Sequence, residues 1–190
     1  MHLVLADNAI ARSKAHGHTV PQLRAGFHIG SCYEFFLAEG LNPAINSYIV
    51  GDVTIELARM IERALPGQIL VGEFHSAPTD EYGNLTSTNI DSIQFIQQAQ
   101  GNLTQLNGLE LSGEAIESIK CYLTGKATPE GTFTIRKLAL NDKHGLTRNV
   151  FNAKINIYRL GGDPILLGIE DRSLRRDDVM VTTVEHIRLS

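Results

Sequence analysis

Residues 51–71, GDVTIELARMIERALPGQILV, decide the fold of this chain. Apolar residues recur every three to four positions, which predicts a helix over about 53–65 with Asp52 as its N-cap. Pro66 and Gly67 end the helix, and a short strand over 68–71 follows at once. A helix that leads directly into a strand is typical of an α/β layer, in which helices cover a sheet. The predicted buried stripe of the helix consists of Val53, Leu57, Met60 or Ile61, and Ala64.

The chain before this stretch predicts one more helix and one more strand. Residues 23–29 alternate strictly between apolar and small or polar side chains, which indicates a strand. A helix is expected over 3–15, where apolar residues keep helical spacing before Gly17. We expect an irregular chain over 31–50, because turn-forming residues occur at 40–43.

The chain after this stretch changes from helical to strand-like patterns. Apolar residues at 90–99 keep helical spacing, and Ser112 is placed to cap a further short helix that ends near Ile119. Polar or glycine-containing turns then separate four β-like runs, which predicts an antiparallel arrangement. The four runs are 132–140, 150–160, 164–170 and 179–189.

Composition limits the function classes. The 190 residues are 43% hydrophobic and 20% charged, as in a globular protein with one core or two small ones. Its net charge of -4 argues against DNA or RNA as a partner. No apolar run approaches the ~20 residues of a membrane-spanning helix and the start lacks a signal-peptide pattern, so we expect a cytoplasmic protein with no membrane partner. Cys32 and Cys121 lack metal-ligand spacing, which predicts reduced, packed thiols.

Two motifs carry a family resemblance. The stretch from Gly51 to Met60, followed by 64–71, resembles the class III adenylate/guanylate cyclase catalytic domain, where a helix that begins Gly-Asp leads to a Pro-Gly-x-Ile strand. Residues 23–30, LRAGFHIG, are similar to the family's Gly-Ile-His-x-Gly strand, and the two motifs occur in the family's order. The resemblance covers about residues 4–74. It implies a ferredoxin-like sheet layer that dimerises, with ATP or GTP at the interface and cyclisation assisted by two divalent metal ions, Mg or Mn.

The resemblance also assigns individual positions. Arg59 falls where the family has the Arg that stabilises the transition state, so Arg59 is the candidate catalytic residue. Ile55 falls where the family has an Asn that holds the ribose, and an Ile side chain makes no hydrogen bond. The position that reads the purine falls near Tyr48. The family's two metal-binding aspartates correspond to positions before the first residue of this sequence, and nothing here matches them.

Several of these residues have simpler roles. For Arg59, the favoured alternative to phosphate binding is a surface ion pair with Glu62 or Glu56. For Asp52, a role as the helix N-cap accounts for the residue without any ligand. Among the histidines, His16 and His18 are expected in a solvated turn, whereas His28 is expected to pack on the sheet under a helix.

Further candidates lie in the second half. Thr124–Thr128 superficially suggests a phosphate loop, but it lacks the required glycine spacing and is expected to form a turn. Residues 119–160 hold eight Lys and Arg against two acidic residues, which suits either a nucleotide's phosphates, an acidic partner or a solvated β-face. A metal-dependent hydrolase is a further possibility, and its candidate site residues would be Asp142, His144, Asp163, Asp171, Asp177 and Asp178.

These observations predict an α/β (α+β) protein: a partial nucleotide-cyclase-like layer in 1–75, and a mixed, antiparallel β-rich extension in 76–190 that packs with it as one unit. We expect a truncated or degenerate cyclase-homology protein of cyclic-nucleotide signalling, a regulatory or interaction module rather than an autonomous cyclase. Uncovered sheet edges favour a homodimer. One alternative is a non-catalytic module that binds a nucleotide or small anion. Another is an active ATP or GTP cyclase whose metal ligands come from an upstream or partner chain.

Overall fold

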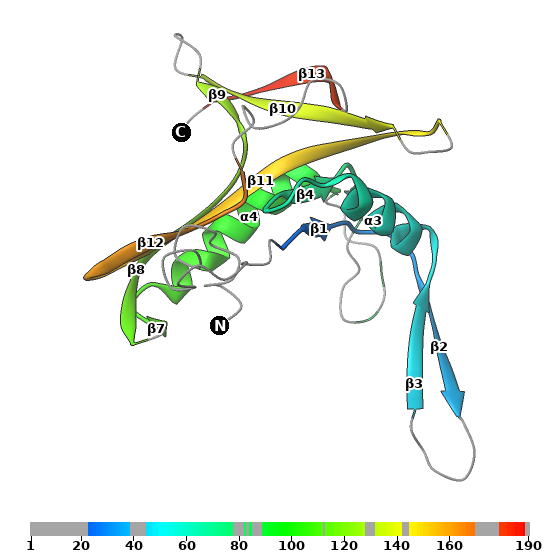
Figure 1. Ribbon diagram of the computed structural model, residues 1–190, viewed down its shortest axis with the longest axis horizontal. Coiled ribbons are helices and arrows are strands. Elements are labelled where there is room, and N and C mark those ends of the chain that lie inside the picture. The colour runs from blue at the N-terminus through cyan, green and yellow to red at the C-terminus, as the bar shows by residue number, and fades with distance from the viewer. Residues whose placement is uncertain are drawn as a thin grey trace, which may run out of the picture.

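A nine-stranded sheet forms the core of the protein (Figure 1). The computed structural model describes residues 23–38, 45–77, 82, 84, 89–111, 113–127, 132–141, 145–169 and 179–188. Five strands follow one path across the sheet: β1 (Ala25–Phe27), β4 (Ile69–Gly72), β11 (Thr147–Arg159), β10 (Thr132–Asn141) and β13 (Val179–Arg188). Four strands pair off this path: β7 (Glu110–Leu111), β8 (Glu114–Leu123), β9 (Gly125–Ala127) and β12 (Gly162–Leu167). With the two α-helices of the described parts, the sheet makes a mixed α+β fold, as predicted.

Strands β1 and β4 run parallel, and α3 (Asp52–Arg63) lies on the connection between them. Gly26 allows α3 to approach β1 closely, because a Cβ there would lie 3.0 Å from side-chain carbons of Leu57 and Ile61. The helix and the two strands that the sequence predicts in this region are confirmed, although β1 is shorter than the predicted strand. The predicted helix at 3–15 lies outside the described residues.

The start of α3 differs from the prediction, since Gly51 and not Asp52 is the N-cap. Asp52 is already helical, and no side chain caps the first turn. A Cβ at Gly51 would lie 2.6 Å from the carbonyl oxygen of Ser31, so this position requires glycine. The Thr54 hydroxyl donates to the Gly51 carbonyl at 2.6 Å. The close approach of the Ser31 carbonyl therefore explains the glycine at the N-cap position.

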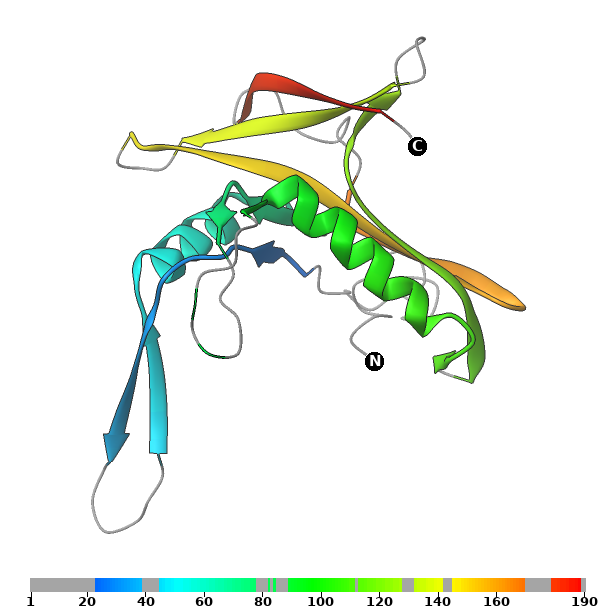
Figure 2. The same ribbon diagram turned by 180° about the vertical axis from the view of Figure 1, so that it is seen from behind.

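The prediction of irregular chain over 31–50 is wrong, because this region contains an antiparallel hairpin of β2 (Tyr33–Ala38) and β3 (Ile45–Val50). Figures 1 and 2 show the hairpin extending away from the nine-stranded sheet. Its strands pair with each other and not with the sheet, so no buried face imposes an apolar–polar alternation on their sequence. Tyr33, Phe35 and Ile49 are 73%, 56% and 59% exposed.

Helix α4 (Ser92–Leu103) covers the face of the sheet opposite α3 (Figure 2). Asp91 caps it in a capping box: the Gln94 amide donates to Asp91 Oδ1 at 2.8 Å, and the Asp91 amide donates to Gln94 Oε1 at 3.2 Å. Phe95 stacks on Phe27 of β1, with ring centroids 4.7 Å apart. The helix predicted from the apolar spacing at 90–99 is thus confirmed. A 3₁₀ turn (Thr104–Leu106) follows it, and two short strands, β5 (His75–Ser76) and β6 (Ile90–Asp91), pair before it.

The predicted short helix between Ser112 and Ile119 is wrong, because this segment enters strand β8. Gly113 turns the chain with φ +85° between β7 and β8. Ile119, Cys121 and Leu123 are buried while Lys120 is exposed, which is the alternation of a half-buried strand. Long-range pairing with β11 therefore overrides the local capping signal.

The four strands predicted for the C-terminal region are confirmed as β10, β11, β12 and β13, with antiparallel pairing between successive neighbours in the sheet. Strand β11 connects two halves of the sheet, because it changes partner on both edges. On one edge it pairs with β4 up to Ala153 and with β12 from Ile155. On the other edge it pairs with β10 up to Phe151 and with β8 from Ala153.

A buried polar network lies where β11 changes partner. Asn152 is 1% exposed, and its Oδ1 accepts from Gln68 Nε2 at 3.1 Å. Its Nδ2 donates to Thr124 Oγ1 at 3.0 Å and to the Ile169 carbonyl at 2.8 Å. Asn152 thus joins four segments of the chain through one amide.

Apolar clusters fill both faces of the sheet. On the α3 face the cluster contains Met60, Ala64, Leu70, Leu138, Leu140 and Val150. On the α4 face it contains Val71, Phe74, Ile96, Cys121, Leu123, Ile135, Phe151 and Ala153. A third cluster extends the α4 face with Ile116, Ile119, Ile157, Ile165 and Leu167. No helix in the described ranges is both long and apolar enough to cross a membrane.

Both cysteines are free thiols, but only one is packed. Cys121 is buried, and burial raises the pKa of its thiol. Cys32 is exposed, so the prediction of two packed thiols is wrong for this residue. It lies in the segment between β1 and the hairpin, beside Gly51 at the start of α3.

Candidate functional site

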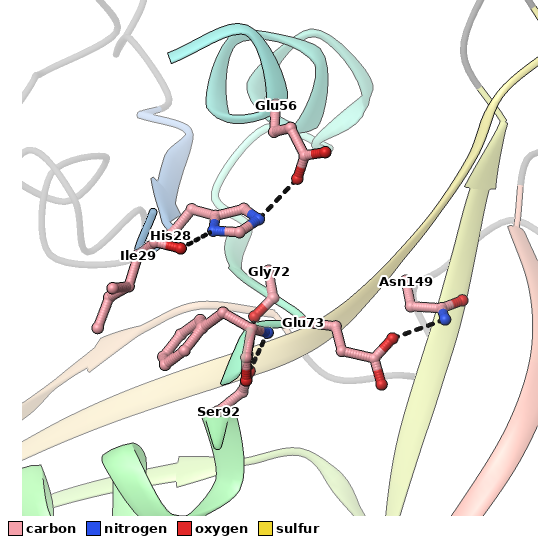
Figure 3. Close-up of polar contacts among 8 residues, drawn as sticks. His28, Ile29, Glu56, Gly72, Glu73, Ser92 and Asn149 are labelled. Atoms are coloured by element: carbon pink, nitrogen blue, oxygen red, sulfur yellow. Dashed lines mark hydrogen bonds and ion pairs between the residues drawn. The ribbon is translucent and has the colours of Figure 1, made fainter. Parts of the chain in front are cut away.

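A polar cluster lies beyond the C-terminal ends of the parallel strands β1 and β4 (Figure 3). His28 follows β1 directly, and Glu73 follows β4 directly. In open sheets with parallel strands, ligands bind most often at this end of the strands. We therefore take this cluster as the candidate site.

His28 joins the end of β1 to helix α3. Its Nε2 lies 2.8 Å from Glu56 Oε2, and its Nδ1 donates to the Ile29 carbonyl at 2.9 Å. Each ring nitrogen therefore faces an oxygen atom, one from the backbone and one from the Glu56 carboxylate. The ring occupies the space above Gly72, where a Cβ would lie 2.9 Å from the ring Cγ. The prediction that His28 packs on the sheet under a helix is confirmed.

Glu73 lies between two donors from neighbouring strands. Its Oε1 accepts from Lys137 Nζ of β10 at 2.5 Å, and its Oε2 accepts from Asn149 Nδ2 of β11 at 2.7 Å. Partial burial raises the pKa of Glu73, but the hydrogen bonds from Lys137 and Asn149 and the nearby positive charge outweigh burial. The pKa of Glu73 therefore lies below its ordinary value.

Ser92 fixes the start of α4 to the end of β4. Its hydroxyl donates to the Gly72 carbonyl at 2.8 Å and accepts from the Phe74 amide at 2.9 Å. The side chain is 2% exposed, and the polar atoms that it contacts here belong to the backbone. These contacts assign Ser92 a structural role, because a nucleophilic serine needs a base beside its hydroxyl.

A small cavity adjoins this cluster, with a volume of about 30 Å³. It is lined by Glu73, Phe74, His75, Asp91, Ser92, Ile93 and Phe151. A space of this size holds a water molecule or two, whereas sites for small-molecule ligands are about ten times larger. The cluster therefore positions α3, α4 and β4 relative to one another and offers little room for a substrate.

The structure places Arg59 in a surface ion pair. Arg59 Nη1 lies 3.3 Å from Glu62 Oε2, one helical turn further along α3. Glu56, the other carboxylate considered for Arg59, pairs with His28 instead. Ile55 is 53% exposed near the start of α3. Tyr48 belongs to β3, and its side chain is outside the described residues.

Most of the remaining candidates cannot be placed in the part of the chain that the structure describes. His16, His18, Asp142, His144, Asp171, Asp177 and Asp178 lie outside the described residues. Asp163 is exposed, and its carbonyl accepts two hydrogen bonds from Arg159. Within the described ranges, no group of three or more His, Cys, Asp or Glu side chains is arranged to hold a metal ion. The donor set that metal-assisted cyclisation requires is thus not found among these residues.

The segment from Thr124 is not the predicted turn. Gly125–Ala127 forms strand β9, which pairs with β10. Thr124 is buried, and its amide donates to the Asn152 carbonyl at 2.8 Å. This segment is therefore part of the sheet.

Sequence reasoning missed Glu73, Lys137 and Asn149, which come from three separate segments. Glu73 carried one usable signal, because a charged residue directly after a buried strand lies at the end of that strand. Nothing in the local sequence around Lys137 or Asn149 indicates that they meet Glu73. Comparison of the chain with family models, with curated proteins and with solved structures gives no match.

Proposed function

We propose that this chain is a degenerate nucleotide-cyclase-homology module of cyclic-nucleotide signalling, which acts by association and not as an autonomous cyclase. The resemblance of residues 23–30 and 51–71 to class III cyclases supports the homology. A parallel pair of strands with a helix on the connection, as in β1, α3 and β4, is compatible with the ferredoxin-like layer that the resemblance implies.

The observation that carries the proposal concerns Arg59 and Ile55 of α3, because the resemblance assigns nucleotide contacts to these two positions. Arg59 lies in an ion pair with Glu62, 3.3 Å away. Ile55 presents an apolar side chain at the position of the ribose-binding Asn. Neither residue offers the contact to a nucleotide that the resemblance assigns to its position, which favours a non-catalytic role.

Exposed apolar residues support association with a second copy of the chain. Tyr33, Phe35, Ile49 and Val50 are exposed on the hairpin, and Ile55 is exposed just beyond it. A two-stranded hairpin has little stability by itself in water, and a group of large exposed apolar side chains is typical of a protein interface. We therefore propose that a homodimer buries this hairpin.

Two measurements on the purified full chain test this proposal. Incubation with manganese and ATP or GTP should yield no cyclic product above that of an Arg59→Ala variant. Cyclic product that disappears in Arg59→Ala would show an active cyclase and overturn the proposal.

Light scattering after gel filtration tests the association. We expect a dimer for the native chain and a monomer for the double variant Tyr33→Ser/Phe35→Ser. Leu160→Ser is the matched control, because Leu160 is 59% exposed but lies between β11 and β12, away from the hairpin. A native chain that is monomeric throughout, or a control that dissociates like the double variant, would contradict the role of the hairpin.

A further inference from the structure

Strand β8 has one edge that other strands cover only in part. Along the first edge it pairs with β11 from Ile116 to Leu123. On the opposite edge, β7 pairs with it at Glu114 and Ala115, and the chain at 108–109 bonds to the Ile116 backbone. Beyond Ile116, no strand in the described ranges pairs with this edge. An uncovered strand edge can pair with another chain, so natural proteins usually block such edges.

Gln100 of α4 bonds to this edge through its side-chain amide, and Figures 1 and 2 show α4 beside β8. Gln100 Nε2 donates to the Ile119 carbonyl at 3.0 Å, and Gln100 Oε1 accepts from the Cys121 amide. Residues 119 and 121 lie two apart in a strand, so their backbone groups point to the same edge. The Cys121 amide donates its one proton to Gln100, so this edge is the one away from β11.

The two bonds reproduce the pattern of a neighbouring strand. They lie on either side of Lys120, and in a parallel pair one residue bonds in the same way to the carbonyl before its partner and to the amide after it. A glutamine side chain ends in an amide that both donates and accepts, as a peptide group does. Gln100 therefore occupies backbone groups that a strand of another chain would need.

The position of Gln100 in α4 favours a role beyond attachment of the helix. Ile93, Ile96 and Leu103 form the apolar stripe with which α4 packs on the sheet, and position 100 continues that stripe. These apolar contacts already attach α4 to the sheet. A polar side chain within the stripe is explained by the strand edge that it meets.

From these contacts we infer that Gln100 is a guard residue, which closes the β8 edge against pairing with a strand of a second copy of this chain. A second copy fits this edge, because two β8 strands paired about a two-fold axis present the same edge and the same face to each other. The inference concerns β8 and not the hairpin, so it does not rest on the dimer proposed above.

Light scattering after gel filtration, over a range of protein concentrations, tests the inference. The parent chain carries Tyr33→Ser/Phe35→Ser, so its own mass reports on the hairpin and any difference from it reports on Gln100. Gln100→Ala removes both bonds, and we expect its mass to rise about twofold above that of the parent as the concentration increases. Gln100→Lys also loses the bond from the Cys121 amide, but a charged side chain at a strand edge disfavours pairing, so it should keep the mass of the parent.

Gln97→Ala is the matched control, because Gln97 is an exposed glutamine of α4 outside this contact. Thermal melts separate stability from association, since both Gln100 variants should melt a few degrees below the parent. Three results would overturn the inference: Gln100→Ala with the mass of the parent, Gln100→Lys that associates as strongly as Gln100→Ala, or Gln97→Ala that associates.

Hydrogen exchange of the native chain provides a measurement that needs no folded variant. The Cys121 amide should exchange as slowly as the amides of β8 that pair with β11, because Gln100 occupies it. Rapid exchange of this amide would show that the edge is open, and would also overturn the inference.

Discussion

Lys137 Nζ lies 2.5 Å from Glu73 Oε1, and this ion pair joins the middle of β10 to the end of β4. The two residues are 64 positions apart in sequence. The Lys137 side chain is only 13% exposed, so solvent screens this ion pair less than it screens a pair at the surface. The contact therefore couples the N-terminal and C-terminal parts of the sheet.

Removing the charge of Glu73 should destabilise the protein at neutral pH. We expect Glu73→Gln to lower the free energy of unfolding by about 1–2 kcal/mol at pH 7, because Lys137 would lose a charged hydrogen bond in a partly buried place. Urea unfolding measures this change. Glu62→Gln is the control, since the exposed Arg59–Glu62 pair should contribute only a few tenths of a kcal/mol.

The same contact makes a prediction about pH. The pKa of Glu73 lies below its ordinary value of 4.5 in the folded protein, so its contribution to stability is complete above that value. It is lost as the pH falls through the folded-state pKa, where the carboxylate becomes protonated. The difference in unfolding free energy between the native chain and Glu73→Gln should therefore shrink from pH 7 to pH 3, and an unchanged difference would contradict the contact.

Gly72 should tolerate no side chain while His28 is present. A Cβ at Gly72 would overlap the His28 ring, so Gly72→Ala should cost about 1–3 kcal/mol of unfolding free energy. Gly101→Ala in α4 is the control, because nothing lies within 4 Å of its added Cβ and alanine is the better helix former. In a double-mutant cycle, the penalty of Gly72→Ala should fall when His28 is also changed to Ala; additive penalties would refute the clash.

The two helix starts should respond differently to loss of their aspartates. Asp91 accepts from the Gln94 amide, so Asp91→Ala should cost about 1 kcal/mol. Asp52 makes no capping hydrogen bond, so Asp52→Ala should cost only the few tenths of a kcal/mol of a charge near a helix N-terminus. Thermal unfolding compares the two variants, and equal losses would contradict the assignment of Gly51 as the N-cap.

Asn152 should be the most sensitive polar position in the sheet. Asn152→Ala would remove the three side-chain hydrogen bonds to Gln68, Thr124 and the Ile169 carbonyl in a buried place, at a cost of about 2–4 kcal/mol. Asn102→Ala, at an exposed position of α4, should change stability by less than about 0.5 kcal/mol. Urea midpoints measure both, and a small effect at Asn152 would show that the network is dispensable.

Sequence patterns predicted those elements whose side chains face the core with a regular period. The spacing of Met60 and Ala64 predicted α3, because these apolar side chains pack in one cluster with Leu70 of the sheet. The spacing of Ile93 and Ile96 predicted α4 for the same reason, because both pack in the cluster on the other face. The hairpin around Tyr33 and Ile49 was missed, because it packs on itself and leaves both residues exposed.

Long-range contacts explain what the sequence did not predict. Strand β8 was mistaken for a helix because its strand state depends on β11, more than 25 residues later in the chain. The contacts of Glu73 with Lys137 and Asn149 depend on the same kind of pairing. Arg59, in contrast, was assigned from a resemblance, and the structure shows the ion pair that its local spacing with Glu62 favours.

The central position of β11 affects how the chain folds while it is being synthesised. During synthesis, residues 69–72 leave the ribosome long before residues 147–159, so β4 has only the short β1 to pair with until then. Contacts of such large sequence separation form slowly, and unpaired strand edges favour aggregation. The edge of β4 that β11 covers in the folded protein therefore stays unpaired until the last third of the chain is made.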